Sequence, residues 1–333
     1  MIAAAWWQAL DNGQAACTLC PIGCRLRPGQ TGPCGTRANR DRTMVPLHYG
    51  QVVSLGVDPI EKKPLYHFHP GRPILSAAAP GCNLHCLFCQ NWSISQQPQA
   101  PTRRVSPEQL VAAAVEENSV GLAFTYSEPL VWYEYVRDTT RAARAAGLKN
   151  VLVTNGFLNP EPLAELLPWI DAANIDLKSM EDRFYRKVCK ARLEPVLAAI
   201  RQFVAAGVHV EVTNLVIPGY NDSDEQLGRL VDFVAGLQPA GGRAIPLHFS
   251  AYHPAWKMDA PPTPRSTLLR AREIALGKLD WVYLGNVGGS EGRDTACREC
   301  GKVVIARSGF QARVHLTQEA RCPGCGNGLP VVM

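Results

Sequence analysis

Short apolar runs alternate with longer helical stretches along most of this 333-residue chain. The apolar runs have the length of β-strands and cover residues 74–79, 121–126, 151–155, 173–177, 208–216, 246–252 and 281–285. The helical stretches between them cover residues 107–117, 130–146, 161–167, 195–206, 224–236 and 267–276. Apolar strands that alternate with helices are typical of parallel β/α units. The pattern therefore predicts an α/β fold, with a full or partial barrel over residues 73–293.

Polar side chains lie within or just after the later part of several of these strands, and one strand carries a histidine. They are Tyr126, Ser127, Glu128, Thr154, Asn155, Asp176, Lys178 and His248. In β/α barrels the chemistry takes place at the carboxyl ends of the strands, and an interior without function is filled with branched apolar residues. Each residue alone could serve as a cap or turn. As a set, they predict an active site on one rim.

Three cysteines follow the first strand at once, in the spacing C-x3-C-x2-C. Cys82, Cys86 and Cys89 on so short a loop can hold three irons of a cubane [4Fe-4S] cluster. No fourth cysteine lies nearby, so one iron would stay open to a small molecule, as a catalytic zinc keeps an open position. Cysteines without a role, or part of a zinc site, are the alternatives.

The chain holds twelve cysteines, of which only Cys189 stands outside three compact groups. The first residues do not read as a signal peptide, and no apolar run is long enough to cross a membrane. Grouped cysteines without an export signal predict metal sites in a reducing cytoplasm rather than disulfides. Cys189 is interpreted as a packing residue. The net charge of +5 is too small to indicate nucleic-acid binding.

The first cysteine group lies within residues 1–72, which we expect to form a small metal module and a connector. Cys17, Cys20, Cys24 and Cys34 have the spacing C-x2-C-x3-C-x9-C, among many glycines and prolines. A unit of this size cannot bury a core of its own and needs a metal to fold. Zinc is the favoured metal, and an auxiliary iron–sulfur cluster is the alternative.

The last cysteine group lies within residues 294–333. Two C-x2-C pairs, Cys297 with Cys300 and Cys322 with Cys325, are separated by 21 residues. Two such pairs around one tetrahedral metal are typical of a zinc ribbon. A rubredoxin-like iron site would use the same ligands. We expect zinc and a structural or docking role.

Much of the chain between Cys17 and Val287 resembles the AmmeMemoRadiSam system radical S-adenosylmethionine (SAM) enzymes, relatives of the pyruvate formate-lyase activating enzyme. The resembling motifs are CTLCPIGC, DPIEKKPLYHFHPG, APGCNLHCLFCQNWSIS, AFTYSEP, TNGF, NIDLKSM, EVTNLVIPGYNDS, PLHFSAYHP and VYLGNV. The resemblance implies an incomplete (β/α)6 barrel whose open side admits a large substrate. It also implies that Cys82, Cys86 and Cys89 ligate the cluster whose open iron binds SAM.

The resemblance further assigns roles to the residues of the rim. Tyr126, Ser127 and Glu128 stand where the activating enzymes bind the methionyl amine of SAM with a Gly-Gly-Glu-Pro motif. Asp176 and Lys178 match an Asp-Leu-Lys motif near SAM and substrate, and Lys178 is expected to be catalytic together with the three cysteines. Thr154 and Asn155 match a Thr-Asn-Gly motif, and His248 lies in the strand that supplies a SAM-contacting histidine.

The function that this implies is that of a radical SAM oxidoreductase. Reductive cleavage of SAM would yield methionine and a 5′-deoxyadenosyl radical, which takes a hydrogen atom from a protein glycyl residue, a peptide or a small molecule. The expected partners are an electron donor such as flavodoxin or ferredoxin and Memo-like proteins. The twelve cysteines also allow two other hypotheses, a metal-stabilised binding or scaffold protein and a redox sensor with a labile cluster.

Overall fold

A mostly parallel eight-stranded sheet forms the centre of the protein, in a computed structural model that describes residues 2–97, 99–237, 239 and 244–333. The strand order is β15-β14-β13-β12-β11-β10-β8-β7. Seven strands are parallel: β8 (Pro73–Ala78), β10 (Gly121–Phe124), β11 (Lys149–Thr154), β12 (Ala172–Asp176), β13 (His209–Val216), β14 (Leu247–Ala251) and β15 (Val282–Gly285). These strands confirm the predicted α/β class.

The sheet is open between its two edge strands. The edge strand β7 (Ser54–Pro59) runs antiparallel to β8, although it lies within the segment that we expected to be a connector. At the other edge, β15 pairs with β14 and, within the described residues, with no other strand of the sheet. The barrel is therefore partial.

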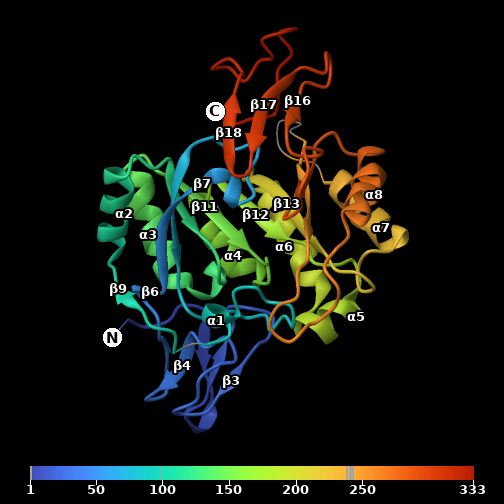
Figure 1. The fold of residues 1–333 in the computed structure, drawn as a ribbon. Coiled ribbons are helices and arrows are strands. Elements are labelled where there is room, and N and C mark those ends of the chain that lie inside the picture. Colours follow the sequence, from blue (N-terminus) through green and yellow to red (C-terminus); the bar gives the residue numbers. More distant parts are fainter. Residues whose placement is uncertain (1, 98, 238, 240–243) are drawn as a thin grey trace.

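Among the described residues, six helices of seven residues or more lie in the connections between the seven parallel strands, and they pack around the sheet (Figure 1). They are α2 (Pro107–Glu116), α3 (Tyr133–Ala145), α4 (Pro160–Leu166), α6 (Leu193–Ala205), α7 (Asp224–Ala235) and α8 (Arg265–Leu276). The start of α2 follows from its sequence: Ser106 and Gln109 form a reciprocal capping box, and Pro107 occupies the first helical position. None of the described helices is both long and apolar enough to span a membrane.

The chain forms smaller units at the two ends of the barrel (Figure 1). At one end lies the amino-terminal module, with β1 (Trp7–Ala9), β2 (Ala15–Cys17), β3 (Arg25–Leu26), β4 (Arg37–Arg40) and β5 (Thr43–Pro46). At the opposite end lies a three-stranded ribbon of β16 (Thr295–Ala296), β17 (Val303–Ser308) and β18 (Gln311–Val314). The short strands β6 (Gln51–Val52) and β9 (Arg103–Arg104) pair with each other.

The segment before β8 closes the ribbon end of the barrel. Ile60, Leu65 and Phe68 are buried in a cluster with apolar residues of β8, β10, β11 and β12. The carboxyl-terminal residues pair with this segment, since the Val332 amide donates to the His67 carbonyl over 2.8 Å. The candidate site therefore lies at the other end of the barrel, at the carboxyl ends of the parallel strands and on the side of the amino-terminal module.

Candidate functional site

The loop that carries Cys82, Cys86 and Cys89 is held by backbone hydrogen bonds to several other segments. It leaves β8 at Gly81, whose amide donates to the Ile94 carbonyl over 2.9 Å, next to the short helix α1 (Trp92–Ser95). The Cys82 amide donates to the Cys34 carbonyl in the amino-terminal module over 3.2 Å. Amides of the loop also donate to the carbonyls of a π-helix, Tyr185–Cys189. These hydrogen bonds fix the backbone of the cysteine loop against the rest of the protein.

The three thiols form a set that fits an iron–sulfur cluster. Hydrogen-bond donors reach the Cys82 sulfur, namely the Leu84 amide at 3.4 Å and the Asn155 side-chain nitrogen at 3.6 Å. The Cys89 sulfur lies 3.1 Å from the Ser95 hydroxyl. Burial raises the pKa of the Cys82 thiol well above its ordinary value, so a bound metal would be needed to hold it as a thiolate. Soft sulfur donors with nearby hydrogen bonds are the environment of such clusters.

Glu128 joins the ends of β10 and β11 beside this loop. Its carboxylate accepts hydrogen bonds from the Thr154 hydroxyl at 2.6 Å and from the amides of Asn155 at 2.8 Å and Leu130 at 3.0 Å. Burial raises the pKa of Glu128 to about 7, although these donors oppose the shift. The structure thus brings Glu128, Thr154 and Asn155 together next to Cys82, as the parallel strand ends predicted.

Asp176 and Lys178 approach the loop from the end of β12. The Lys178 Nζ lies 2.9 Å from the Asp176 carboxylate and 5.7 Å from the centre of the Phe88 ring. Burial alone would lower the pKa of Lys178, but Asp176, Cys86 and Cys189 together raise it well above its ordinary value. The lysine therefore places a positive charge beside the cysteine loop.

Tyr126 and Ser127 also lie against the loop, by different contacts. The Asn91 side-chain nitrogen donates to the Tyr126 carbonyl over 2.8 Å, and the Ser127 hydroxyl donates to the Ala79 carbonyl over 2.5 Å. Tyr126 has a φ of 68°, which turns its side chain away from the strand direction. The Tyr126 carbonyl and the Ser127 hydroxyl are thus both used within the protein, and the expected contact of the two residues with SAM stays a prediction.

His248 makes its contacts away from the residues that surround the cysteine loop. Its Nε2 lies 2.6 Å from the Glu211 carboxylate, and its ring packs edge-on against Tyr66, with ring centres 4.8 Å apart. Glu211 is fully buried and also lies 3.1 Å from His209 Nε2. The expected contact of His248 with SAM stays a prediction.

Sequence reasoning missed a charged cluster next to Tyr126, at the edge strand β7. Asp58 accepts hydrogen bonds from Lys62 at 2.8 Å, from Lys63 at 2.6 Å and from the Tyr126 hydroxyl. Lys63 is fully buried, and burial lowers its pKa to about 8. The sequence could have indicated this cluster, because three charged residues lie in a proline-flanked segment before β8. Only the fold shows that they contact Tyr126.

Cys189 was interpreted as a packing residue, and it is fully buried. Burial raises the pKa of Cys189 well above its ordinary value, and the neighbouring Cys86 thiol adds to this shift. Its carbonyl accepts the His85 amide at 2.9 Å. Cys189 therefore packs directly against the cysteine loop.

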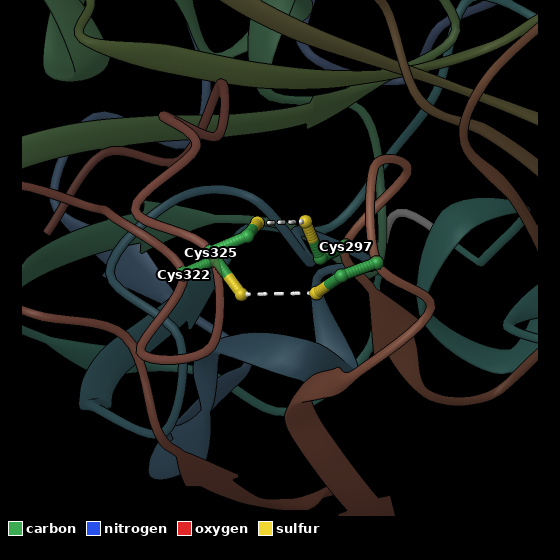
Figure 2. Close-up of side chains that lie close together, drawn as sticks. Cys297, Cys322 and Cys325 are labelled. Atoms are coloured by element: carbon green, nitrogen blue, oxygen red, sulfur yellow. Dashed lines mark hydrogen bonds between the residues drawn. The ribbon is translucent and has the colours of Figure 1, made fainter.

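The four carboxyl-terminal cysteines form a separate candidate metal centre (Figure 2). The sulfurs of Cys297 and Cys325 are 3.6 Å apart, as are those of Cys300 and Cys322. All four sulfurs lie within 4.8 Å of one another. Sulfurs of a tetrahedral site with metal–sulfur bonds of about 2.3 Å are about 3.8 Å apart. The cysteines thus have the spacing for one ion.

Comparisons with known proteins agree with this arrangement. A sequence model of the radical SAM superfamily matches residues 78–233, which contain the cysteine loop, Glu128 and Lys178. An uncharacterized protein of Methanocaldococcus jannaschii is 45% identical over 336 residues, which cover 99% of each chain. The pyruvate formate-lyase 1-activating enzyme of Escherichia coli strain K12 is 26% identical over 212 residues, 62% of this chain and 76% of that protein.

Among solved structures, Streptococcus suis SuiB bound to its precursor peptide SuiA is similar in fold. The TM-score is 0.50 at 15% sequence identity, with 70% of this chain and 52% of that chain covered. At this level of identity the similarity concerns the fold alone.

Proposed function

Because this chain belongs to the radical SAM superfamily, whose members use a [4Fe-4S] cluster to cleave SAM, we propose that Cys82, Cys86 and Cys89 hold that cluster. When bound, the cluster and SAM supply a 5′-deoxyadenosyl radical, released with methionine, that abstracts a hydrogen atom from the substrate. The observation that carries the proposal is the contact of the cysteine loop with two adjacent strand ends, since Asn155 reaches the Cys82 sulfur with its side chain and Glu128 with its amide.

The surrounding residues bind and orient SAM. Glu128 accepts a hydrogen bond from the amino group of SAM, since Oε2 accepts only the Asn155 amide among the described residues. Asn155 and the Leu84 amide donate to the Cys82 sulfur, which favours the reduced state of a cluster there. Lys178, held by Asp176, attracts negative charge on SAM or substrate.

Activity is tested first by SAM cleavage. Protein reconstituted anaerobically with iron and sulfide is incubated with SAM and dithionite, and 5′-deoxyadenosine is measured by chromatography. We expect the product from the native chain and none from Cys86→Ala. Cys300→Ser, which removes a sulfur of the ribbon, is the matched control and should keep the activity per iron. A chain with its iron in place that forms no 5′-deoxyadenosine would favour the redox-sensor hypothesis.

The substrate is proposed from the resemblance to the AmmeMemoRadiSam and activating enzymes. It is a protein glycyl residue or a peptide, presented with Memo-like partners, and the electron comes from a flavodoxin or ferredoxin. The open edge between β7 and β15 supports a large substrate. Deuterated partner protein should transfer deuterium to 5′-deoxyadenosine, detected by mass spectrometry. Transfer from deuterated small molecules only would contradict the macromolecular substrate.

Zinc is proposed for the ribbon. The sulfur spacing of the four cysteines supports a single tetrahedral ion, and zinc is the commonest such ion with four thiolates. Metal analysis of the native chain against Cys297→Ser/Cys325→Ser should show the loss of about one zinc. Loss of one iron instead would identify a rubredoxin-like site.

A further inference from the structure

We propose that Cys17, Cys20, Cys24 and Cys34 hold a second [4Fe-4S] cluster rather than zinc, and that this cluster passes electrons to the site at Cys82, Cys86 and Cys89. Four observations carry the proposal: the spacing of the sulfurs, the space between them, the donors around them and the contact between the two sites.

The sulfurs of the amino-terminal module are too far apart for one ion. Two sulfurs on the same zinc, each at about 2.3 Å, are at most about 4.6 Å apart. Among the residues that the structure describes, the four ribbon cysteines are the one group of three or more ligands with all donor atoms within 4.8 Å. Any three of the four amino-terminal sulfurs therefore include a pair more than 4.8 Å apart.

The same chain supplies two internal comparisons. The ribbon sulfurs come as close as 3.6 Å, as a single ion requires. The sulfurs of Cys82, Cys86 and Cys89, by contrast, do not all lie within 4.8 Å of one another, and that loop belongs to a superfamily that binds a cubane cluster there. The amino-terminal cysteines have the wide spacing of the cluster loop and lack the narrow spacing of the ribbon.

A cavity occupies the space between these sulfurs. All four cysteines line it, together with apolar side chains such as Leu19 and Ile22. The four thiols therefore face a common space, where four cysteine ligands can surround a cubane of four irons and four sulfides. The apolar lining would also keep water from the cluster.

Polar groups lie against two of the sulfurs. The guanidinium of Arg37 lies 3.7 Å from the Cys17 sulfur, and the Thr36 hydroxyl lies 3.2 Å from the Cys34 sulfur. Arg37 is only 2% exposed and is held by an ion pair with Glu134 on α3. Hydrogen bonds and a positive charge at the sulfurs stabilise the reduced cluster, which is the more negative state.

The two sites are in direct contact. The Cys82 amide donates to the Cys34 carbonyl over 3.2 Å, so a ligand of one site is hydrogen-bonded to a ligand of the other. Four cysteine ligands leave no open iron for a substrate, which makes electron transfer the role that fits. A flavodoxin- or ferredoxin-type donor gives one electron to the amino-terminal cluster. That cluster passes the electron to the neighbouring one and returns to its oxidised state.

The test compares iron in three variants of the full chain after anaerobic reconstitution. We expect about eight irons in the native protein and about four in Cys82→Ala/Cys86→Ala/Cys89→Ala. The triple variant keeps the amino-terminal module intact, so its result does not depend on whether changes in that module disturb folding. Cys17→Ser/Cys20→Ser should also hold about four irons, and Cys300→Ser/Cys325→Ser should retain about eight.

Electron paramagnetic resonance identifies the species. The reduced triple variant should show a signal of a [4Fe-4S] cluster that SAM does not alter. The fully reduced native protein should show signals broadened relative to the sum of the two single-site variants, because neighbouring spins interact. A triple variant with zinc and no iron would overturn the second cluster, while leaving the proposed SAM chemistry intact. Unbroadened signals in a protein with about eight irons would overturn the electron transfer.

Discussion

At the scale of single residues, the barrel interior holds charged side chains whose burial favours their neutral forms. Burial raises the pKa of Glu128 to about 7 and lowers that of Lys63 to about 8. Both groups are tied to the rim, Glu128 by Thr154 and Asn155, and Lys63 by a 3.3 Å contact with the Tyr126 hydroxyl. Their protonation is therefore linked to stability and, under the proposed function, that of Glu128 is linked to SAM binding.

SAM binding should depend on the protonation of Glu128. The carboxylate, which accepts the hydrogen bond from SAM, is formed as the pH rises through the pKa of about 7, so the affinity should rise over that range and level off above it. Loss of a hydrogen bond to a charged group costs about 1.5–3 kcal/mol, about tenfold or more in the dissociation constant. Glu128→Gln should bind more weakly with no inflection there, measured by calorimetric titration of reconstituted protein. The same inflection in the glutamine variant would contradict this role.

Lys63 and Lys62 form a matched pair for testing the buried charges. Both contact Asp58, but the Lys63 side chain is fully buried whereas that of Lys62 is 40% exposed. Lys63→Met should lower the free energy of unfolding by about 3 kcal/mol, because it removes one partner of a buried ion pair. Lys62→Met should change it by less than about 1 kcal/mol. Thermal unfolding of both variants under identical anaerobic conditions distinguishes them, and equal shifts would argue against the interior placement of Lys63.

At the scale of elements, the helices and strands follow the periodicity closely, and the differences lie where the site is built. The run 121–126 is expected to be one strand, but β10 ends at Phe124 because Tyr126 adopts a positive φ. The expected helix 130–146 is split into a 3-10 turn, Pro129–Val131, and α3. The turn begins at Glu128, whose side chain accepts the Leu130 amide. Local departures from regular structure thus position the residues next to Cys82.

Gly81 is the point where β8, the cysteine loop and the amino-terminal module meet. Its φ is +99°, and a Cβ there would lie 2.5 Å from the Cys34 carbonyl oxygen and 2.6 Å from Thr36. Gly81→Ala should push the two sites apart and lower the iron content, measured after reconstitution. Gly207→Ala has a similar strain, with φ of +77°, but nothing within 4 Å of the added atom. Equal iron in the two variants would show that the contact is not needed for cluster assembly.

At the scale of the whole molecule, the two small cysteine units lie at opposite ends of the barrel (Figure 1). The amino-terminal module meets the carboxyl ends of the strands through Cys34 and Cys82. The ribbon packs on the other end, where Tyr66, Trp281 and Tyr283 share its apolar cluster. Arg307 of β17 donates to the Tyr66 carbonyl over 2.8 Å and stacks on its ring. The cysteine loop and the ribbon are thus separated along the barrel.

Loss of the ribbon metal should therefore affect stability and leave the chemistry in place. Cys297→Ser/Cys322→Ser should lower the midpoint of thermal unfolding, because a metal-bound ribbon unfolds when its ligands are lost. Iron content and 5′-deoxyadenosine formed per iron should remain at the native values, measured on the folded fraction at low temperature. A parallel loss of iron would mean that the ribbon supports the cluster site across the barrel.

The sequence by itself determined the α/β class, the order of strands and helices, the three cysteine sets and the rim of Glu128, Asn155 and Lys178. These follow from local periodicity and from one topological rule, that parallel strands end on the same side. The tertiary structure alone decided which residues touch. It placed Cys34 on Cys82, Asp58 and Lys63 on Tyr126, and His248 on Glu211. The path of the folded backbone decides which distant segments touch and how far apart two cysteine sulfurs lie. The number of residues between two cysteines does not determine either.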